Sequence, residues 1–196
     1  MDDLRRELPD VDGTWTAFVD RDGVVNRRIP GDYVRTLDEF EPLPGAVAAL
    51  ARLSDTFGRV VVVTNQAGVG KGLVDPDALD EIHASLRAAV EAASGRLDAV
   101  LVCPHRVEDR CGCRKPAVGL ALAAVERFDD VDLARTVMIG DSRSDMEFAS
   151  ALGLPAVLVT GTGGEHGNLP PSAEPLARVE DLPAAVELLS GRPAQG

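Results

Sequence analysis

Side chains that could bind a metal ion and a phosphate follow four segments of this 196-residue sequence. Asp20 and Asp22 end the segment "TAFVDRD", Thr64 ends "RVVVVT", Asp141 ends "TVMIGD", and Lys115 follows the cysteine-rich "CGCR". One acid at the end of a strand is ordinary turn chemistry, because Asp-Gly favours a turn. Acids, a hydroxyl and a lysine at four such places indicate one shared chemical site.

The elements that must position these side chains are short apolar runs alternating with helical patterns. The apolar runs, each typical of a strand buried on both faces, span residues 16–20, 59–65, 97–104, 136–141 and 155–161. The helical patterns span residues 44–55, 75–95, 115–128, 144–154 and 180–191. This alternation predicts an α/β fold with a doubly wound, mainly parallel sheet flanked by helices on both faces. Ligands of such sheets bind beyond the carboxyl ends of the strands, where the candidate residues lie.

The chain length predicts one domain over residues 1–196, with a core from about 14 to 161 and a C-terminal segment 162–196. Only residues 21–58 separate the first two expected strands, and they must include a helix. We therefore expect no cap domain, and an active site covered by loops alone.

The composition restricts the partners. A net charge of -12 disfavours nucleic acid but allows a small phosphorylated substrate, which needs only a local positive pocket. No apolar run approaches the ~20 residues of a membrane span, and the first twelve residues show no signal-peptide pattern. We expect a cytoplasmic protein that does not bind membranes, and a monomer, because nothing in the sequence demands an oligomer.

The three cysteines lie within the pattern C-x-H-x5-C-x-C, formed by Cys103, His105, Cys111 and Cys113. Three thiolates and one imidazole form a closed tetrahedral zinc site without the open position of a catalytic zinc. The alternative is unrelated buried cysteines beside a surface histidine. A structural zinc ion would tie down the loop 103–113, which leads directly to Lys115.

The four motifs, in this order, resemble those of the haloacid dehalogenase superfamily of phosphohydrolases. "DRDG" matches the D-x-D-G motif, "VVVVTNQ" the strand ending in Ser or Thr, "RK" the lysine, and "GDSRSD" the G-D-x-x-x-D motif. The resemblance covers roughly residues 16–161 and implies a Rossmannoid core. It also implies Asp20 as nucleophile, Asp22 as acid and base, and Thr64 and Lys115 as stabilisers of the transferred phosphoryl group.

The resemblance further implies a catalytic Mg²⁺ held by the side chains of Asp20 and Asp141 and the backbone carbonyl of Asp22, with Asp145 supporting. This agrees with the chemistry, because a phosphate dianion repels an attacking carboxylate unless a cation screens the charge. Asp22 must carry a proton when the substrate arrives. We therefore expect neighbouring acids to raise its pKa.

The zinc loop narrows the resemblance to the group of heptose 1,7-bisphosphate and histidinol-phosphate phosphatases. It implies the substrate-binding residues Asn26, Tyr33, Asn65, Gln66 and Arg114. Three departures concern the leaving group: the zinc loop is short, residues 27–33 are altered, and Ser142 replaces a basic residue. A heptose 1,7-bisphosphate is the predicted substrate, and histidinol phosphate or another sugar phosphate is the alternative.

Other functions fit the sequence less well. A non-enzymatic zinc-stabilised interaction module would not need the motif acids and Lys115, and the negative net charge disfavours a nucleic-acid phosphatase. The segment "NQAGVGKGL" is not a P-loop, because its first Gly and its hydroxyl are missing. Lys71 in this segment could reach a distal phosphate or simply be solvated. His83 is expected to be an ordinary surface or hydrogen-bonded histidine.

Overall fold

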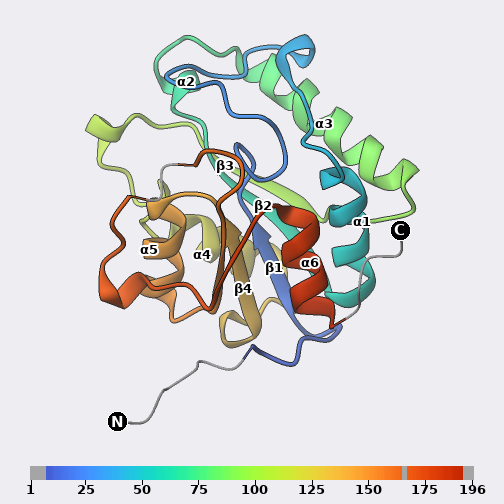
Figure 1. The fold of residues 1–196 in the computed structure, drawn as a ribbon. Coiled ribbons are helices and arrows are strands. Elements are labelled where there is room, and N and C mark those ends of the chain that lie inside the picture. Colours follow the sequence, from blue (N-terminus) through green and yellow to red (C-terminus); the bar gives the residue numbers. More distant parts are fainter. Residues whose placement is uncertain (1–7, 165–166, 192–196) are drawn as a thin grey trace.

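One six-stranded sheet, in which all pairs are parallel, forms the centre of the computed structural model, which describes residues 8–164 and 167–191 (Figure 1). The strands are β1 (Thr16–Val19), β2 (Arg59–Asn65), β3 (Ala99–Cys103), β4 (Thr136–Gly140), β5 (Ala156–Val159) and β6 (Ala177–Val179). Their order in the sheet is β3-β2-β1-β4-β5-β6. The chain changes direction across the sheet between β1 and β4, so the carboxyl ends of these two strands form the switch point where ligands bind in open parallel sheets.

Helices cover both faces of the sheet, as the alternating pattern predicts (Figure 1). The α-helices are α1 (Ala46–Thr56), α2 (Ala67–Gly70), α3 (Pro76–Ala92), α4 (Gly119–Arg127), α5 (Arg143–Leu152) and α6 (Leu182–Ser190). Short 3-10 turns are η1 (Leu37–Glu39), η2 (Val107–Asp109), η3 (Leu133–Arg135) and η4 (Pro171–Ala173). Helices α1, α3 and α6 contribute to one core cluster, and α4 and α5 to the other.

Period-two alternation divides each apolar run between these two clusters. In β1, Ala17 and Val19 belong to the cluster of α1, α3 and α6, whereas Phe18 packs with α4 and α5. All three side chains are fully buried, as the continuous apolar run predicts. Burying such side chains stabilises the fold by roughly 1.5–3 kcal/mol for each large one, so β1 is anchored from both sides.

Local signals explain where several helices begin. The Asp75 side chain accepts a hydrogen bond from the Asp77 amide, and Pro76 occupies the first turn of α3. The Asp181 side chain caps α6 in the same way, by accepting from the amide of Ala184. These are the Asp and Pro positions that favour a helix start in any sequence.

Several details differ from the sequence prediction, and the short helix α2 is one of them. Strand β6 was not predicted, because three partly exposed residues carry no periodic signal and the strand forms only by pairing with β5. Helix α4 begins at Gly119, whereas the sequence predicted a helix from residue 115. Pro116 therefore lies in a turn before the helix. Lys115 therefore lies on a loop, four residues before the helix.

Residues 20–58, between β1 and β2, contain only η1 and α1 besides loops, so no cap domain is inserted there. The five residues at the end of the C-terminal segment and residues 165–166 lie outside the described part of the chain. Within that described part, no helix is long and apolar enough to cross a membrane.

Candidate functional site

Three aspartates from different elements meet at the switch point of the sheet. Asp20 follows β1, Asp141 follows β4, and Asp145 lies in the first turn of α5. Carboxylate oxygens of the three lie within 4.8 Å of one another, and all three residues are buried. Parallel strands end at the same edge of the sheet, which explains why acids more than 100 residues apart in sequence share one site.

Lys115 is buried between two of these acids. Its Nζ lies 2.8 Å from Asp20 Oδ1 and 2.6 Å from Asp145 Oδ1, and it donates to the carbonyl oxygen of Val63 at 2.6 Å. Two donors of the ammonium thus make hydrogen bonds, to Asp20 and to Val63, and Asp145 adds an ion pair. Burial alone would lower the pKa of Lys115, but the charges of Asp145 and Asp20 raise it above its ordinary value, so the lysine stays cationic.

Burial next to other acids favours the neutral form of two of these carboxyl groups, Asp20 and Asp141. Burial, with a contribution from Asp145, raises the pKa of Asp20 to about 6 in spite of Lys115. Burial, with the charge of Asp20, raises the pKa of Asp141 to about 8. A second positive charge in this cluster would stabilise the ionised forms of both groups.

Such a charge already lies against the oxygens expected to hold Mg²⁺. The Arg28 guanidinium is 3.0 Å from Asp141 Oδ1 and 3.3 Å from the carbonyl oxygen of Asp22. These oxygens thus attract a cation, and oxygen is the ligand atom that Mg²⁺ prefers. The residues present therefore fit the predicted metal. The ammonium of Lys115 pairs with Asp145 as well as with Asp20, which is an expected metal ligand.

Asp22 is held differently from the other acids, and the expectation that its pKa is raised is wrong for this structure. Burial would raise the pKa of Asp22, but the charge of Arg21 and hydrogen bonds outweigh it, so that pKa is lowered. Arg21 Nη2 donates to both carboxylate oxygens, at 2.9 and 3.0 Å. The amides of Asn26 and Gln66 donate to one oxygen each, at 2.9 and 2.6 Å.

The polar residues at the end of β2 join these two groups. The Gln66 amide nitrogen, besides contacting Asp22, lies 2.8 Å from Thr64 Oγ1. The Asn65 amide pairs with the backbone of Lys115, donating to its carbonyl at 3.1 Å and accepting from its N–H at 3.0 Å. Asn65 thus fixes the loop that carries the lysine.

A cavity of about 350 Å³ opens beside this cluster. Its lining includes Asp20, Asp22, Thr64, Lys115 and four of the residues predicted to contact substrate, Tyr33, Asn65, Gln66 and Arg114. Asn26 is not in this lining: it is fully buried and donates a hydrogen bond to Asp22, so its contact with substrate stays a prediction. Arg28 from the altered loop also lines the cavity.

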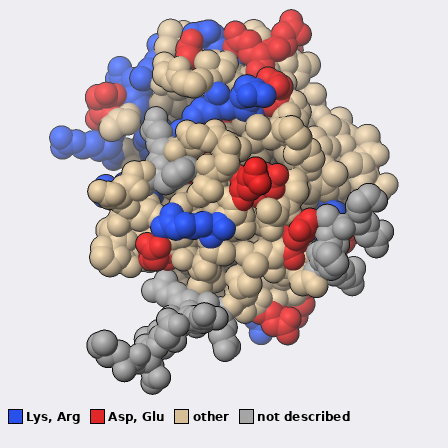
Figure 2. Space-filling view, in the orientation of Figure 1, with Lys and Arg blue, Asp and Glu red and all other residues tan. Residues whose placement is uncertain are grey.

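The cavity brings cations together with the acids. Its lining carries Arg28, Arg114 and Lys115, which balance the formal charges of Asp20, Asp22 and Asp32, although the net charge of the protein is -12. Figure 2 shows blue side chains gathered at the upper left, over the region that holds α2 and the loop after β3 in Figure 1. Lys71 is not in the lining; its Nζ lies 5.5 Å from the ring centre of Tyr33, a cation–π contact.

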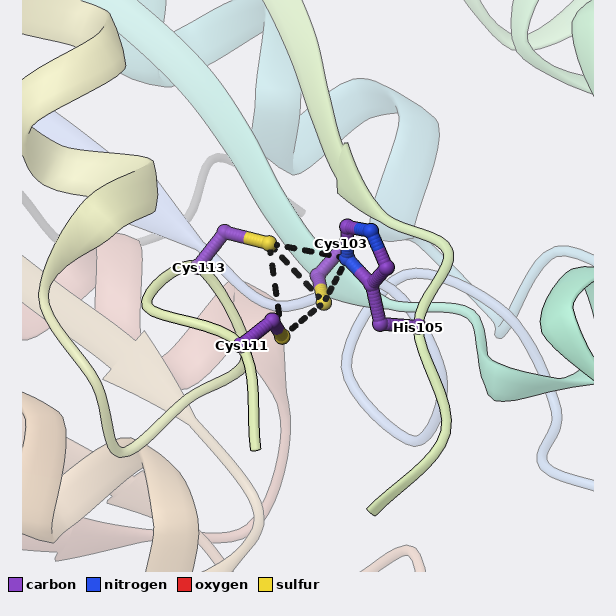
Figure 3. A group of neighbouring side chains, drawn as sticks. All are labelled: Cys103, His105, Cys111 and Cys113. Atoms are coloured by element: carbon purple, nitrogen blue, oxygen red, sulfur yellow. Dashed lines mark hydrogen bonds between the residues drawn. The ribbon is translucent and has the colours of Figure 1, made fainter. Parts of the chain in front are cut away.

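The side chains of Cys103, His105, Cys111 and Cys113 point toward one another (Figure 3). The three sulfur–sulfur distances are 3.3, 3.6 and 3.6 Å, and His105 Nδ1 lies 3.7 Å from Cys103 Sγ and 3.2 Å from Cys113 Sγ. Tetrahedral ligands at about 2.3 Å from zinc would be separated by somewhat under 4 Å, close to these values. All three cysteines are free thiols, so the cluster has the donors and the spacing for zinc.

The sequence did not single out Arg21 or Arg28 as site residues, and it treated His83 as ordinary. The Arg21 side chain is fully buried and reaches His83 Nε2 at 3.1 Å. His83 is also buried, and burial and the charge of Arg21 lower its pKa to about 3. The one available signal was an arginine placed between two motif acids, which does not reveal its partner on α3.

Comparisons with known proteins agree with the site. A family model described as HAD-hydrolase-like matches residues 112–185. A D-glycero-alpha-D-manno-heptose-1,7-bisphosphate 7-phosphatase from Mycobacterium bovis is 45% identical over 135 residues, which are 69% of this chain and 71% of that protein. A D-glycero-beta-D-manno-heptose-1,7-bisphosphate 7-phosphatase from Bordetella bronchiseptica is 39% identical over 176 residues, covering 88% and 96%.

The fold is also similar to that of a solved heptose-bisphosphate phosphatase. The crystal structure of D,D-heptose 1,7-bisphosphate phosphatase from B. bronchiseptica, complexed with magnesium and phosphate, matches with a TM-score of 0.79 and 38% sequence identity. The match covers 89% of this chain and 97% of the other.

The turn that follows the two motif acids Asp20 and Asp22 should tolerate no side chain at Gly23. Its φ of +93° disfavours other residues, and a Cβ there would collide with the Asp141 carboxylate. We expect Gly23→Ala to lower the free energy of unfolding by about 1–3 kcal/mol from strain, with a further loss from the collision. Gly153→Ala is the matched control, because its φ is +68° and nothing lies within 4 Å of the added Cβ. Equal losses in urea unfolding would contradict the steric argument.

Proposed function

The chain belongs to the haloacid dehalogenase-like hydrolases, among the heptose-bisphosphate phosphatases, and from this premise we propose that it removes the 7-phosphate from a D-glycero-D-manno-heptose 1,7-bisphosphate. It is a phosphatase and not a zinc-stabilised binding module. The observation that carries the proposal is the cavity itself, whose lining contains the ion pair of Lys115 with Asp20 and also Arg114. The phosphate that is removed needs the nucleophile Asp20 and the charge of Lys115. The planar donors of Arg114 suit the second phosphate of a bisphosphate.

The proposed reaction has two steps. In the first, a carboxylate oxygen of Asp20 attacks phosphorus, the bond from phosphorus to the sugar oxygen breaks, and Asp22 donates a proton to that oxygen. In the second, water attacks phosphorus and gives a proton to Asp22, the bond from phosphorus to the Asp20 oxygen breaks, and inorganic phosphate leaves with the Asp20 carboxylate restored. With two displacements, a positioned carboxylate instead of water attacks phosphorus in the step that expels the sugar oxygen.

The chain's own cations and donors hold the phosphoryl group during both steps. Lys115 keeps one oxygen of Asp20 in place, and its charge lies next to the position where phosphate must bind. Thr64, in contact with the Gln66 amide, offers a hydroxyl at the same end of the sheet. The Asp22 carboxylate must leave its contact with Arg21 or gain a proton before it can act as an acid, because its pKa is lowered in the structure without substrate.

We propose Mg²⁺ as the catalytic cofactor, held by the side chains of Asp20 and Asp141 and the backbone carbonyl of Asp22. When bound, it supplies positive charge that screens the phosphate dianion from the attacking carboxylate. The supporting observations are the crowded acids with raised pKa values and the position of Arg28 against two of these oxygens. The Bordetella relative is complexed with magnesium and phosphate in its crystal structure.

We propose zinc as a structural ion in the loop 103–113. The loop ends two residues before Lys115, and Asn65 holds the lysine backbone from the other side. Zinc would therefore fix one end of the segment that carries the buried ammonium, although that segment is a loop and not the helix terminus expected from the sequence.

The substrate is tested by kcat/KM on both anomers of D-glycero-D-manno-heptose 1,7-bisphosphate and on histidinol phosphate, with and without Mg²⁺. We expect hydrolysis only with Mg²⁺, a clear preference for a heptose bisphosphate, and a product that keeps its 1-phosphate in the phosphorus NMR spectrum. A preference for histidinol phosphate would reject the substrate but leave the reaction class standing.

Substitution of the two motif aspartates, Asp20 and Asp22, should impair different parts of the reaction. We expect Asp20→Asn to lower kcat by at least about 10³-fold, because no nucleophile remains. Asp22→Asn should lower kcat by about 10²-fold or more with a nearly unchanged KM, because general acid–base catalysis contributes that much. Rapid-quench detection of phosphoryl-enzyme separates them, since only Asp22→Asn retains the attacking carboxylate. Unchanged turnover in Asp22→Asn would remove this residue from the mechanism.

The zinc proposal is tested by metal analysis of the purified protein, in which we expect about one zinc ion per chain. His105→Ala should lose the zinc and lower the melting temperature, because three thiolates alone leave the site open. His105→Cys is the matched control, since it restores four ligands and should retain the metal. A zinc-free wild-type protein with the same melting temperature would contradict the proposal.

A further inference from the structure

Arg21 is a charged side chain with no exposure to solvent, so its donors must be satisfied by the protein. Its Nε and Nη2 face the carboxylate of Asp22, with Nη2 donating to both oxygens. Its Nη1 points the other way, to Nε2 of His83 at 3.1 Å. The guanidinium therefore lies between Asp22, the candidate proton donor, and His83 of α3, and contacts both.

The direction of the contact between Arg21 and His83 determines the state of the ring. An arginine has only donors, so His83 Nε2 must accept and carry no proton. The ring is then neutral, with its proton on Nδ1. A protonated or apolar side chain at position 83 would leave Nη1 without an acceptor in a buried place, which costs free energy or forces the guanidinium to move.

The line of contacts reaches the reacting groups in two steps. His83 holds Arg21, and Arg21 holds Asp22, whose carboxylate lines the cavity beside Lys115 and Thr64. His83 does not line the cavity, so it cannot act on the substrate directly. The amides of Asn26 and Gln66 complete the hold on Asp22 from other directions.

We propose that His83 is a positioning residue for the reaction: by accepting a hydrogen bond from Arg21, it sets the orientation from which Asp22 delivers its proton to the leaving oxygen. The inference rests on the proposed function, because it assigns the proton transfer to Asp22. It concerns only displacements in which Asp22 transfers a proton, and not the binding of phosphate.

The leaving group provides the test, since a sugar alkoxide needs a proton to leave and p-nitrophenolate does not. The parameter kcat/KM reports the steps up to departure of the leaving group, before water attacks the intermediate. We expect His83→Leu to lower kcat/KM on heptose bisphosphate by about tenfold to a hundredfold, part of the effect of a general acid. On p-nitrophenyl phosphate the same variant should change kcat/KM by less than about threefold, because the other groups of the site stay in place.

Two further variants separate positioning from stability. His83→Gln keeps an acceptor near the place of Nε2 and should recover most of the lost rate on heptose bisphosphate. Leu86→Ala removes a buried side chain of the same helix that offers Arg21 no hydrogen-bond acceptor, so it should lower the melting temperature and leave the ratio of the two kcat/KM values unchanged. If His83→Leu does not fold, His83→Asn replaces it, because its amide is too short to reach Arg21.

The proposal is overturned if the variant without the acceptor lowers kcat/KM on both substrates equally, or if the glutamine variant is no better than the leucine or asparagine variant. Failure of the proposed function would look different: the wild-type protein itself would not hydrolyse the heptose bisphosphate.

Discussion

The burial of one ammonium group constrains this whole structure. Lys115 has almost no contact with solvent, and a buried cation is tolerated only when every donor finds an acceptor and its charge is balanced. Asp20 after β1, the Val63 carbonyl on β2 and Asp145 on α5 provide this balance. Losing one partner of such a buried pair typically costs about 3–5 kcal/mol, so the group that organises catalysis also ties three elements together.

The same requirement extends outward from the lysine. Its backbone is held by the Asn65 amide on one side, and the cysteine-rich loop leads into it on the other. Asp145 is held in turn, because the Ser142 backbone N–H and hydroxyl donate to its other oxygen at 3.0 and 2.6 Å. Each acid and amide near the site thus has a fixed partner, which is how a loop-covered site can be precise without a cap.

Two motif aspartates, with a single residue between them, have opposite electrostatic surroundings. Burial and the charge of Asp145 raise the pKa of Asp20 to about 6, whereas Asp22 faces Arg21 and two amides and its pKa is lowered. The difference assigns them different work, as happens whenever neighbouring carboxyl groups carry separate roles. It also means that the proton on Asp22 depends on what substrate binding does to its contact with Arg21.

The sequence by itself determined the five main strands, the layers of the fold, the motif residues and the zinc-type cluster, because apolar periodicity and residue spacing are local properties. It also implied the family through four motifs in order. Only the tertiary structure decided which donor meets which acceptor. Asn26 supports Asp22 instead of lining the cavity, and Asn65 holds the lysine loop.

The same holds for the edge strand β6, which exists through its pairing with β5, and for the contact of Arg21 with His83, 62 residues away. Such partners depend on how packed elements orient their side chains. Local patterns in the amino-acid sequence do not carry that information.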